Sequence, residues 1–334
     1  MSGKVCSAES QDQNAVAYGP VPSRRLGRSL GINNIPAKTC TYSCVYCQLG
    51  RTTRMPVDRQ PFYDPERIFA EVQEKVGRCR AVGESIDYLA FVPDGEPTLD
   101  VNLGKEIELL RNLGVKIAVL TNASLIDRDD VKDALAKVDL VSLKVDAVSE
   151  DIWHKVNRPQ RSLNLSSMLA GMRDFTKMFK GQVISETMLI EKFNDTDEEI
   201  RKIAAFLMGL QPSKAYIAIP TRPPAENWVH AAGEDKINLA YQILSGSLGP
   251  DRVEYLIGYE GDAFASTGRI EEDLLSITSV HPMRREAVEG LLRKTDSDWP
   301  VVESLIKKEK LIQIGYGGHD FYMRRLPSRS SGAS

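Results

Sequence analysis

Short apolar runs alternate with amphipathic stretches through the middle of the chain. The runs are almost continuously hydrophobic and rich in β-branched residues, and they cover residues 29–35, 88–92, 115–120, 140–145, 183–190 and 215–219. Strands of this kind, separated by helices, predict a parallel sheet whose outer face is covered. The pattern alone leaves two arrangements open, an incomplete curved barrel of six units and a doubly wound sheet.

Two of the intervening stretches carry clear signals for the start of a helix. Asp64 precedes Pro65, which is the order expected of an N-cap followed by the first helical residue. Residues 195–198 have the composition of a capping arrangement before a second stretch with apolar positions at Ile200 and Ile203. Both stretches are therefore predicted to be helices that pack on the sheet.

The pattern changes after about residue 268. Three amphipathic stretches, 270–278, 285–294 and 299–309, predict short helices, and alternating runs at 311–314 and 321–323 flank a glycine-rich turn. Three helices followed by a hairpin resemble a winged helix-turn-helix, which often places a helix in the DNA major groove. From Arg284 to Arg325 there are nine Lys and Arg residues and seven Asp and Glu residues, so the charge is nearly balanced. DNA or RNA binding and protein docking both stay open.

Composition and length agree with a cytoplasmic enzyme. The chain has 334 residues, of which 42% are hydrophobic, and a formal net charge of −3. No apolar run approaches the ~20 residues of a membrane helix, and the polar start lacks the apolar centre of a signal peptide. We expect a disordered tail at 1–17, a barrel at 18–262, a winged-helix-like domain at 268–326 and a disordered tail at 327–334.

Basic residues gather on both sides of one short motif, although the whole chain is slightly acidic. Such a belt attracts an anionic substrate or RNA, but it also occurs as a solvated surface or as a site for a single carboxylate. All three interpretations stay open. The residues are Arg24, Arg25, Arg28, Lys38, Arg51, Arg54 and Arg59.

The motif between them is a group of three cysteines, Cys40, Cys44 and Cys47, with the spacing C-x₃-C-x₂-C. A structural zinc site needs four ligands, and the next candidates, Cys79 and His154, are distant in sequence. Three thiolates instead hold three irons of a [4Fe–4S] cube and leave the fourth iron open to a substrate or cofactor. The spacing therefore favours one open iron–sulfur cluster.

This motif resembles the hallmark of the radical S-adenosylmethionine (SAM) superfamily. A second resemblance lies in Asp94, Gly95, Glu96 and Pro97, which are similar to the Gly-Gly-Glu segment that contacts the SAM amino group in that superfamily. The run is also similar to the wyosine-synthase-like subgroup, and the likeness covers about residues 20–225. It implies a six-stranded partial (βα)₆ TIM-like barrel, which decides between the two arrangements left open by the strand pattern.

The resemblance also implies where the cofactor residues lie. Chemistry in such barrels sits at the C-terminal ends of the strands, and Asn122, Lys144 and Asp146 occupy those positions. Tyr46, the aromatic before the third cysteine, is expected near the adenine of SAM, or as a cover for the cluster. Each polar residue also has a structural alternative: Asn122 as a turn residue, Asp146 as a helix cap, and Lys144 as the partner of Glu186.

The implied activity is reductive cleavage of SAM to methionine and a 5′-deoxyadenosyl radical, which takes hydrogen from a substrate carbon. Radical generation needs no general base, so no catalytic side chain is predicted. We expect one cluster per chain, a low-potential electron donor of the flavodoxin or ferredoxin type, and a macromolecular substrate, either tRNA or a protein. The alternative function is a redox- or oxygen-sensing regulator whose winged helix binds DNA.

Overall fold

The computed structural model describes residues 16–92, 94–257, 264, 266, 268–280 and 282–325. Almost all of the two tails predicted to be disordered, and the predicted boundary near 262, lie outside the described residues. At residues 16 and 17 the structure differs from the predicted tail. Val16 is buried and Ala17 opens a strand.

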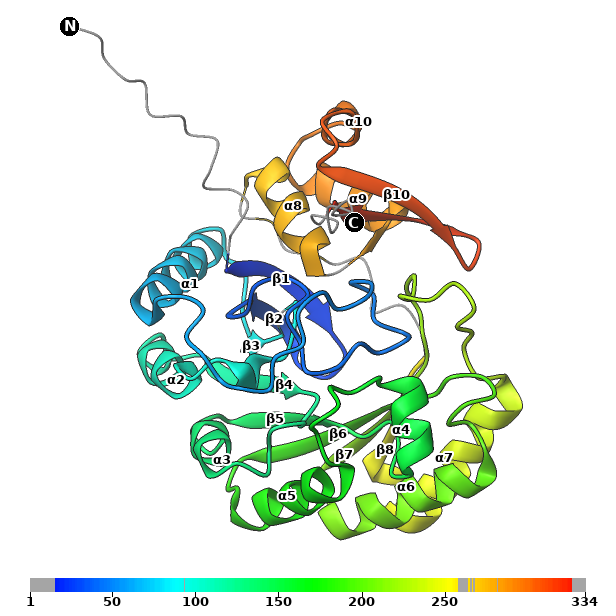
Figure 1. Cartoon of the computed structure of the whole chain (residues 1–334). Coiled ribbons are helices and arrows are strands. Elements are labelled where there is room, and N and C mark those ends of the chain that lie inside the picture. The colour runs from blue at the N-terminus through cyan, green and yellow to red at the C-terminus, as the bar shows by residue number, and fades with distance from the viewer. Residues whose placement is uncertain are drawn as a thin grey trace, which may run out of the picture.

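One eight-stranded sheet forms the body of the protein, with its strands in chain order from β1 to β8 (Figure 1). The strands from β2 to β8 run parallel, whereas β1 pairs antiparallel with β2 at one edge. The strands are β1 (Ala17–Ser23), β2 (Gly27–Ile32), β3 (Tyr88–Phe91), β4 (Lys116–Thr121), β5 (Leu140–Lys144), β6 (Gln182–Met188), β7 (Lys214–Ala218) and β8 (Val253–Leu256).

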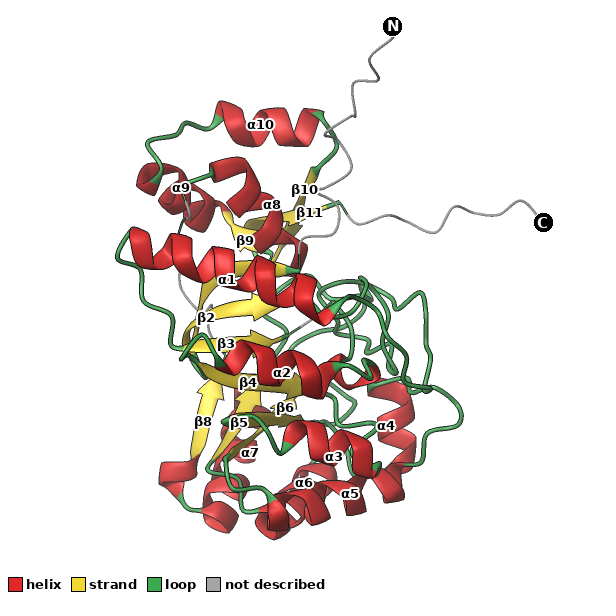
Figure 2. Cartoon of the chain, turned by 90° about the vertical axis from the view of Figure 1, so that its left-hand side faces the viewer, coloured by secondary structure: helices red, strands yellow, loops and turns green. Residues whose placement is uncertain are grey.

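The sheet curls into a half barrel, which confirms the predicted fold class. All six predicted strands are present as β2 to β7, with ends that differ by a few residues from the prediction. The prediction missed β1 and β8, which extend the barrel at its two edges. Successive strands connect through helices that lie along the outer side of the curved sheet (Figure 2).

The helices of the barrel are α1 (Pro65–Ala81), α2 (Leu103–Arg111), α3 (Asp129–Leu135), α4 (Glu150–Val156), α5 (Leu165–Met178), α6 (Asp197–Leu210) and α7 (Glu234–Leu248). The predicted cap of α1 is confirmed, since the Asp64 side chain accepts a hydrogen bond from the Glu66 N–H. Helix α6 is capped in the same way by Thr196. None of the described helices is long and apolar enough to cross a membrane.

Two layers of apolar side chains follow from the alternation along the strands. On β3, Leu89 and Phe91 point outward into the main core beneath the helices. Ala90 on the same strand and Ala118 on β4 belong to a smaller cluster on the opposite face. Larger side chains, among them Leu140, Ile184 and Tyr216, complete this smaller cluster.

The remaining elements form what we call the C-terminal module, residues 268–280 and 282–325. It contains α8 (Ile270–Val280), β9 (Met283–Arg284), α9 (Arg285–Lys294), α10 (Pro300–Lys307), β10 (Leu311–Tyr316) and β11 (His319–Arg324). The three predicted helices and the hairpin are present, and β9 adds a third strand in the order β10-β11-β9. Whether the module acts as a winged helix stays a prediction.

The C-terminal module sits on the β1 edge of the barrel, beside α1 (Figures 1 and 2). Its apolar core includes Leu274 and Leu291 together with Tyr18 and Val21 from β1. A polar contact adds to this packing, since Lys75 Nζ of α1 donates to Ser276 Oγ of α8 at 3.3 Å. The module and the edge of the barrel therefore share one hydrophobic core.

Candidate functional site

The three motif cysteines lie in a loop that follows β2, at the C-terminal edge of the parallel strands. Backbone hydrogen bonds fix this loop from two sides: the Cys40 N–H donates to the Arg54 carbonyl at 3.0 Å, and the Val45 N–H donates to the Val156 carbonyl at 2.9 Å. Val45 itself is fully buried. We call residues 38–54 the cluster loop.

Amide side chains from two other segments approach the thiols, one directly after β4 and one at the C-terminal end of α4. Asn122 Nδ2 lies 3.5 Å from Cys40 Sγ, and Asn157 Nδ2 lies 3.5 Å from Cys44 Sγ. Burial raises the pKa of the Cys44 thiol to about 12, and the charges of Asp146 and Cys47 add to the effect. Burial likewise raises the pKa of Cys40 and Cys47.

The donor set suits an iron–sulfur cluster. Three crowded thiols that disfavour one another's ionisation become thiolates readily only when positive charge enters among them. Across the described part of the chain, no three His, Cys, Asp or Glu side chains converge on one point to hold a single metal ion. A four-iron cube instead binds one thiolate at each of three separate irons. Its protein ligands therefore lie around the cluster and need not converge on one point.

The segment after β3 touches the backbone of the cluster loop. The Lys38 N–H donates to the Asp94 carbonyl at 2.8 Å, and the Glu96 N–H donates to the Thr39 carbonyl at 3.2 Å. A Cβ placed on Gly95 would lie 1.8 Å from the Thr39 oxygen. Glycine at position 95 therefore allows the segment after β3 to pack directly against the backbone of the cluster loop.

Glu96 is buried and its carboxylate is engaged by the protein. It accepts hydrogen bonds from the Thr98 N–H and hydroxyl, from the Thr121 hydroxyl, and from the Asn122 N–H, at 2.6 to 3.0 Å. Burial still raises its pKa, against these four donors. Glu96 ties β3 to β4 and sets the position of Asn122, while Pro97 begins the short 3₁₀ helix η3 (Pro97–Leu99) that follows.

Asp94 is buried, but only one of its two carboxylate oxygens has a hydrogen-bond partner among the described residues. Its Oδ2 accepts from Asn33 Nδ2 at 2.8 Å, and its N–H donates to Asn33 Oδ1 at 2.9 Å. Its Oδ1 is buried with no hydrogen-bond partner among the described residues. Burial raises the pKa of Asp94 to about 7, and the Asn33 hydrogen bond opposes that rise. Buried acceptors without a donor are uncommon in folded proteins, so this oxygen requires an explanation.

Asp146, after β5, holds the opposite side of the cluster loop. Its carboxylate accepts from the Tyr46 hydroxyl, from Asn157 Nδ2 at 2.8 Å and from the Met188 N–H at 2.8 Å. Asp146 does not cap α4, whose N-cap residue is Ser149. The structure thus brings Tyr46 and Asp146 together across the strand ends, as one connected group.

A charged cluster lies inside the half barrel, next to Tyr46. Lys144 Nζ and Arg25 Nη1 both contact the carboxylate of Glu186, as the Lys144–Glu186 alternative predicted. Burial opposes ionisation of Glu186, but Arg25 and Lys144 outweigh it and lower its pKa to about 2. Lys144 Nζ also lies 5.1 Å from the centre of the Tyr46 ring.

These side chains surround a cavity of about 230 Å³ at the strand ends. The lining combines charged, hydroxyl and amide groups on an apolar floor, as binding sites for small molecules commonly do. It consists of Arg25, Tyr46, Val92, Leu120, Thr121, Asn122, Ser142, Lys144 and Glu186. Of the predicted cofactor residues, Tyr46, Asn122 and Lys144 line the cavity directly.

Sequence reasoning missed the ion pairs that tie the cluster loop to the segment after β7. Glu226 accepts two hydrogen bonds from the Arg51 guanidinium, at 2.8 and 2.9 Å, and one from Arg158 at 2.5 Å. The Arg51 fork holds the pKa of Glu226 at about 2. Asn33 and Asn157 were missed as well. No local pattern marks any of them, because each partner is distant in sequence.

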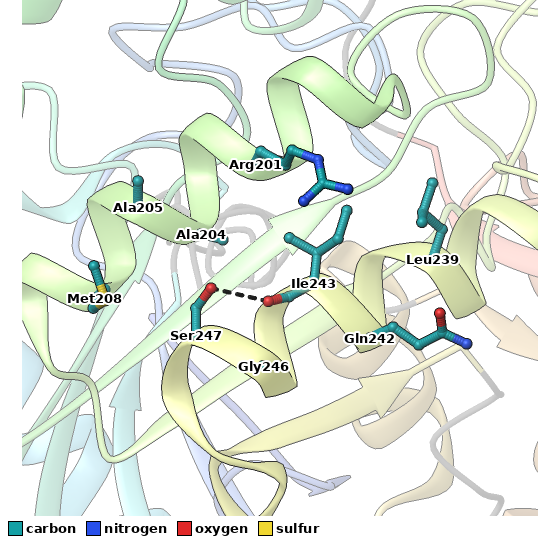
Figure 3. A pocket seen from close by; sticks show the side chains of 9 residues that line it. All are labelled: Arg201, Ala204, Ala205, Met208, Leu239, Gln242, Ile243, Gly246 and Ser247. Carbon is teal, nitrogen blue, oxygen red and sulfur yellow. Dashed lines mark hydrogen bonds between the residues drawn. The ribbon is translucent and has the colours of Figure 1, made fainter.

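A larger hollow of about 560 Å³ lies elsewhere, between α6 and α7 (Figure 3). Ala204, Ala205, Met208 and Ile243 give it an apolar lining, and Arg201 supplies its one ionisable group. It belongs to the helical layer outside the sheet, whereas the cysteines and the charged cluster occupy the strand ends. Its chemistry therefore does not connect it to the candidate site.

Comparison with known proteins identifies relatives across the barrel. The family model of the Radical SAM superfamily matches residues 34–207. A UPF0026 protein of Methanocaldococcus jannaschii is 46% identical over 319 residues, covering 96% of this chain and 99% of its own. A probable dual-specificity RNA methyltransferase RlmN of Pseudothermotoga lettingae is 24% identical over 201 residues, or 58% of this chain and 57% of that protein.

A solved structure agrees with the fold. A radical SAM methyltransferase from Sphaerobacter thermophilus superposes with a TM-score of 0.52 at 20% identity, covering 68% of this chain and 66% of that one. The shared fold is the half barrel.

Proposed function

The chain belongs to the radical SAM superfamily, whose members use a [4Fe–4S] cluster and SAM, and from this we propose a specific arrangement of both cofactors. Cys40, Cys44 and Cys47 hold one cluster, and the strand-end cavity receives SAM. The observation that carries the proposal is the meeting of three partly buried thiols and the buried carboxylate of Asp94, one of whose oxygens has no hydrogen-bond partner, at one edge of the sheet.

Asp94 is the proposed partner of the SAM ammonium group. Its Oδ1 is a buried acceptor without a donor, and a charge-assisted hydrogen bond there would satisfy it. Glu96 has a different role, because four protein donors already occupy it. Glu96 and Asp146 position the loops, while Tyr46 and Asn122 face the cavity and are placed to contact the nucleoside of SAM.

When bound, the cluster supplies the electron that splits SAM into methionine and a 5′-deoxyadenosyl radical, which then takes a hydrogen atom from the substrate. The protein's own part is to orient the reactants and keep water away. Arg25 and Lys144 both pair with the Glu186 carboxylate in a fixed ion cluster in the cavity wall, so none of the three needs to exchange a proton during turnover.

The substrate that we propose is a macromolecule, either tRNA or a protein, with a flavodoxin- or ferredoxin-type protein as the electron donor. RNA is supported by the likeness to a protein named as an RNA methyltransferase. A macromolecule agrees with a cavity of about 230 Å³ at the strand ends, which leaves little room for a second whole molecule beside SAM. The comparisons give no support to a DNA-binding regulator.

The test begins with anaerobic reconstitution of the full chain. About four irons and four sulfides per chain are expected, with 5′-deoxyadenosine released from SAM after dithionite is added. Replacing Cys40, Cys44 and Cys47 with alanine should abolish both the cluster and SAM cleavage. Replacing Cys79, which is buried in helix α1, should abolish neither. A full cluster in the triple variant would contradict the ligand assignment.

Asp94→Asn tests the SAM position separately. Asparagine keeps the shape and one carbonyl oxygen for Asn33, but it removes the charge. SAM should bind roughly 10- to 100-fold more weakly, the usual worth of a charge-assisted hydrogen bond. Asp58→Asn is the matched control, since Asp58 is an exposed acid near the cluster loop. Equal SAM affinity in the Asp94→Asn and control proteins, by calorimetry, would overturn the placement.

A further inference from the structure

Trp228 stands out on the rim of the candidate site. Its side chain is 40% exposed, and it is the one aromatic among the large exposed hydrophobic residues of the described chain. Its loop is firmly held: the Glu226 N–H donates to the Val45 carbonyl at 3.1 Å, and Val229 is buried. The indole is therefore kept at the surface by a well-anchored loop that is tied directly to the cluster loop.

Two neighbouring side chains contact the Trp228 indole and hold it in place. Phe193, from the segment after β6, packs against it with ring centres 5.3 Å apart. The Arg158 guanidinium lies 5.9 Å from the centre of the indole and also pairs with Glu226. A tryptophan held at the surface in this way, on a segment bonded to the cluster loop, offers a flat aromatic face to a planar ligand.

Positive charge lies beside Trp228 on the cluster loop. Arg51 reaches Glu226 and still leaves 71% of its side chain exposed. Lys38 Nζ lies over Gly50, 3.7 Å from where a Cβ of that residue would be, and therefore next to Arg51. The exposed Arg54 lies in the same loop, where its backbone pairs with Thr39, the residue after Lys38. Glu226, the acid among these groups, is buried and already neutralised by two arginines.

We propose that Trp228 and the cations Lys38, Arg51 and Arg54 form a binding site for single-stranded nucleic acid. One unpaired base stacks on the indole, and the phosphates on either side of it contact the cations. Aromatic stacking beside cationic side chains is how proteins hold unpaired strands. An acidic protein would use the cations but has no need of the indole, so the aromatic group decides between the two. The inference rests on the proposed function, because it identifies the substrate class of that same site.

The test measures binding of a fluorescein-labelled, mixed-sequence 12-nucleotide RNA to the reconstituted full chain by anisotropy, without oxygen. Trp228→Ala should weaken binding roughly 5- to 150-fold, the range expected for losing one stacked base. Trp228→Phe should restore most of the affinity, since it keeps an aromatic face. Met208→Ala is the control, because Met208 is similarly exposed but lies on α6, in the outer helical layer.

Salt dependence tests the cations. Each phosphate contact contributes about 0.7 to the slope of log affinity against log salt for a single strand. Lys38→Gln and Arg54→Gln should each lower the slope by roughly that amount, and Arg201→Gln on α6 should leave it unchanged. Iron content is measured for every variant, so that damage to the cluster loop is seen directly.

Three results would overturn the proposal: unchanged affinity in Trp228→Ala, equal binding of a base-paired duplex of the same RNA, or equal binding of polyglutamate of matched charge. The last would instead identify a docking surface for an acidic protein. SAM cleavage by the same preparations, without RNA, tests the proposed function independently. If the protein cleaves SAM but does not bind RNA as expected, the nucleic-acid site is contradicted and the proposed function is not.

Discussion

The close contact at Gly95 gives the sharpest test of how the cluster loop is built. In Gly95→Ala the new Cβ would lie 1.8 Å from the Thr39 oxygen, whereas real contacts of this kind essentially never fall below 3.0 Å. The cluster loop must therefore retreat by at least 1.2 Å (3.0 less 1.8 Å). The partner is backbone, which cannot rotate away as a flexible side chain does.

That retreat breaks two hydrogen bonds, from the Lys38 N–H to the Asp94 carbonyl and from the Glu96 N–H to the Thr39 carbonyl. Each is worth about 0.5–1.5 kcal/mol, and overpacking costs a further 1–3 kcal/mol or so. The free energy of unfolding should fall by roughly 2–6 kcal/mol. The cluster should also be lost or become labile, because Cys40 follows Thr39 directly.

The assay is urea unfolding of the apoprotein under reducing conditions, together with iron analysis after reconstitution. Gly77→Ala is the matched control. Gly77 is an exposed residue in the middle of α1, and nothing lies within 4 Å of the new methyl group. That variant should gain up to about 1 kcal/mol through helix propensity. A Gly95→Ala protein as stable as the wild type, with a full complement of iron, would refute the reasoning.

Three further outcomes are expected. Tyr18→Phe removes the 2.6 Å hydrogen bond from the Tyr18 hydroxyl to the Val92 carbonyl, and should cost about 1–3 kcal/mol in urea unfolding because that carbonyl loses its donor. Burial raises the pKa of Glu106 to about 9 and that of Asp100 to about 6. Their contribution to stability is then complete below about pH 4 and is lost progressively as pH rises from about 4 to about 9; Glu106→Gln should flatten this loss in unfolding curves recorded across that range. Ending the chain at residue 257 should expose the core shared with β1 and make the cluster labile, whereas a truncated protein that keeps both cluster and SAM cleavage would support a module used only for substrate recruitment.

The fold was largely predictable because its signals are local. Six buried parallel strands appear as short apolar runs, and the helix starts at Asp64 and Thr196 follow capping rules that need only a few neighbouring residues. Strand β1 was missed for the same reason. Its sequence contains Gly19, Pro20 and Pro22, which indicate a turn, and it is held as a strand by its partner β2 and by the C-terminal module.

The candidate site was predictable in its members but not in their roles. The resemblance pointed to Asp94 and Glu96 together, but only the structure separates a carboxylate with four donors from one with an unused oxygen. Asp146 was expected as a cofactor-binding residue or a helix cap. It does not cap α4, and its carboxylate joins Tyr46 to Asn157, while contact with SAM stays a prediction. Such roles depend on partners dozens of residues away, which periodicity and spacing do not encode.

The hydrophobic core that joins β1 to the C-terminal module has a consequence for how the protein is made. Tyr18 leaves the ribosome long before Leu291 and Leu305 of the same core are synthesised. A nascent chain that has emerged only as far as β8 still has the β1 edge of its barrel uncovered. The Tyr18 hydroxyl reaches the end of β3, close to Asp94, so we expect the cofactor site to mature only after translation of the last strands. A cluster inserted before that point would encounter an incompletely folded site.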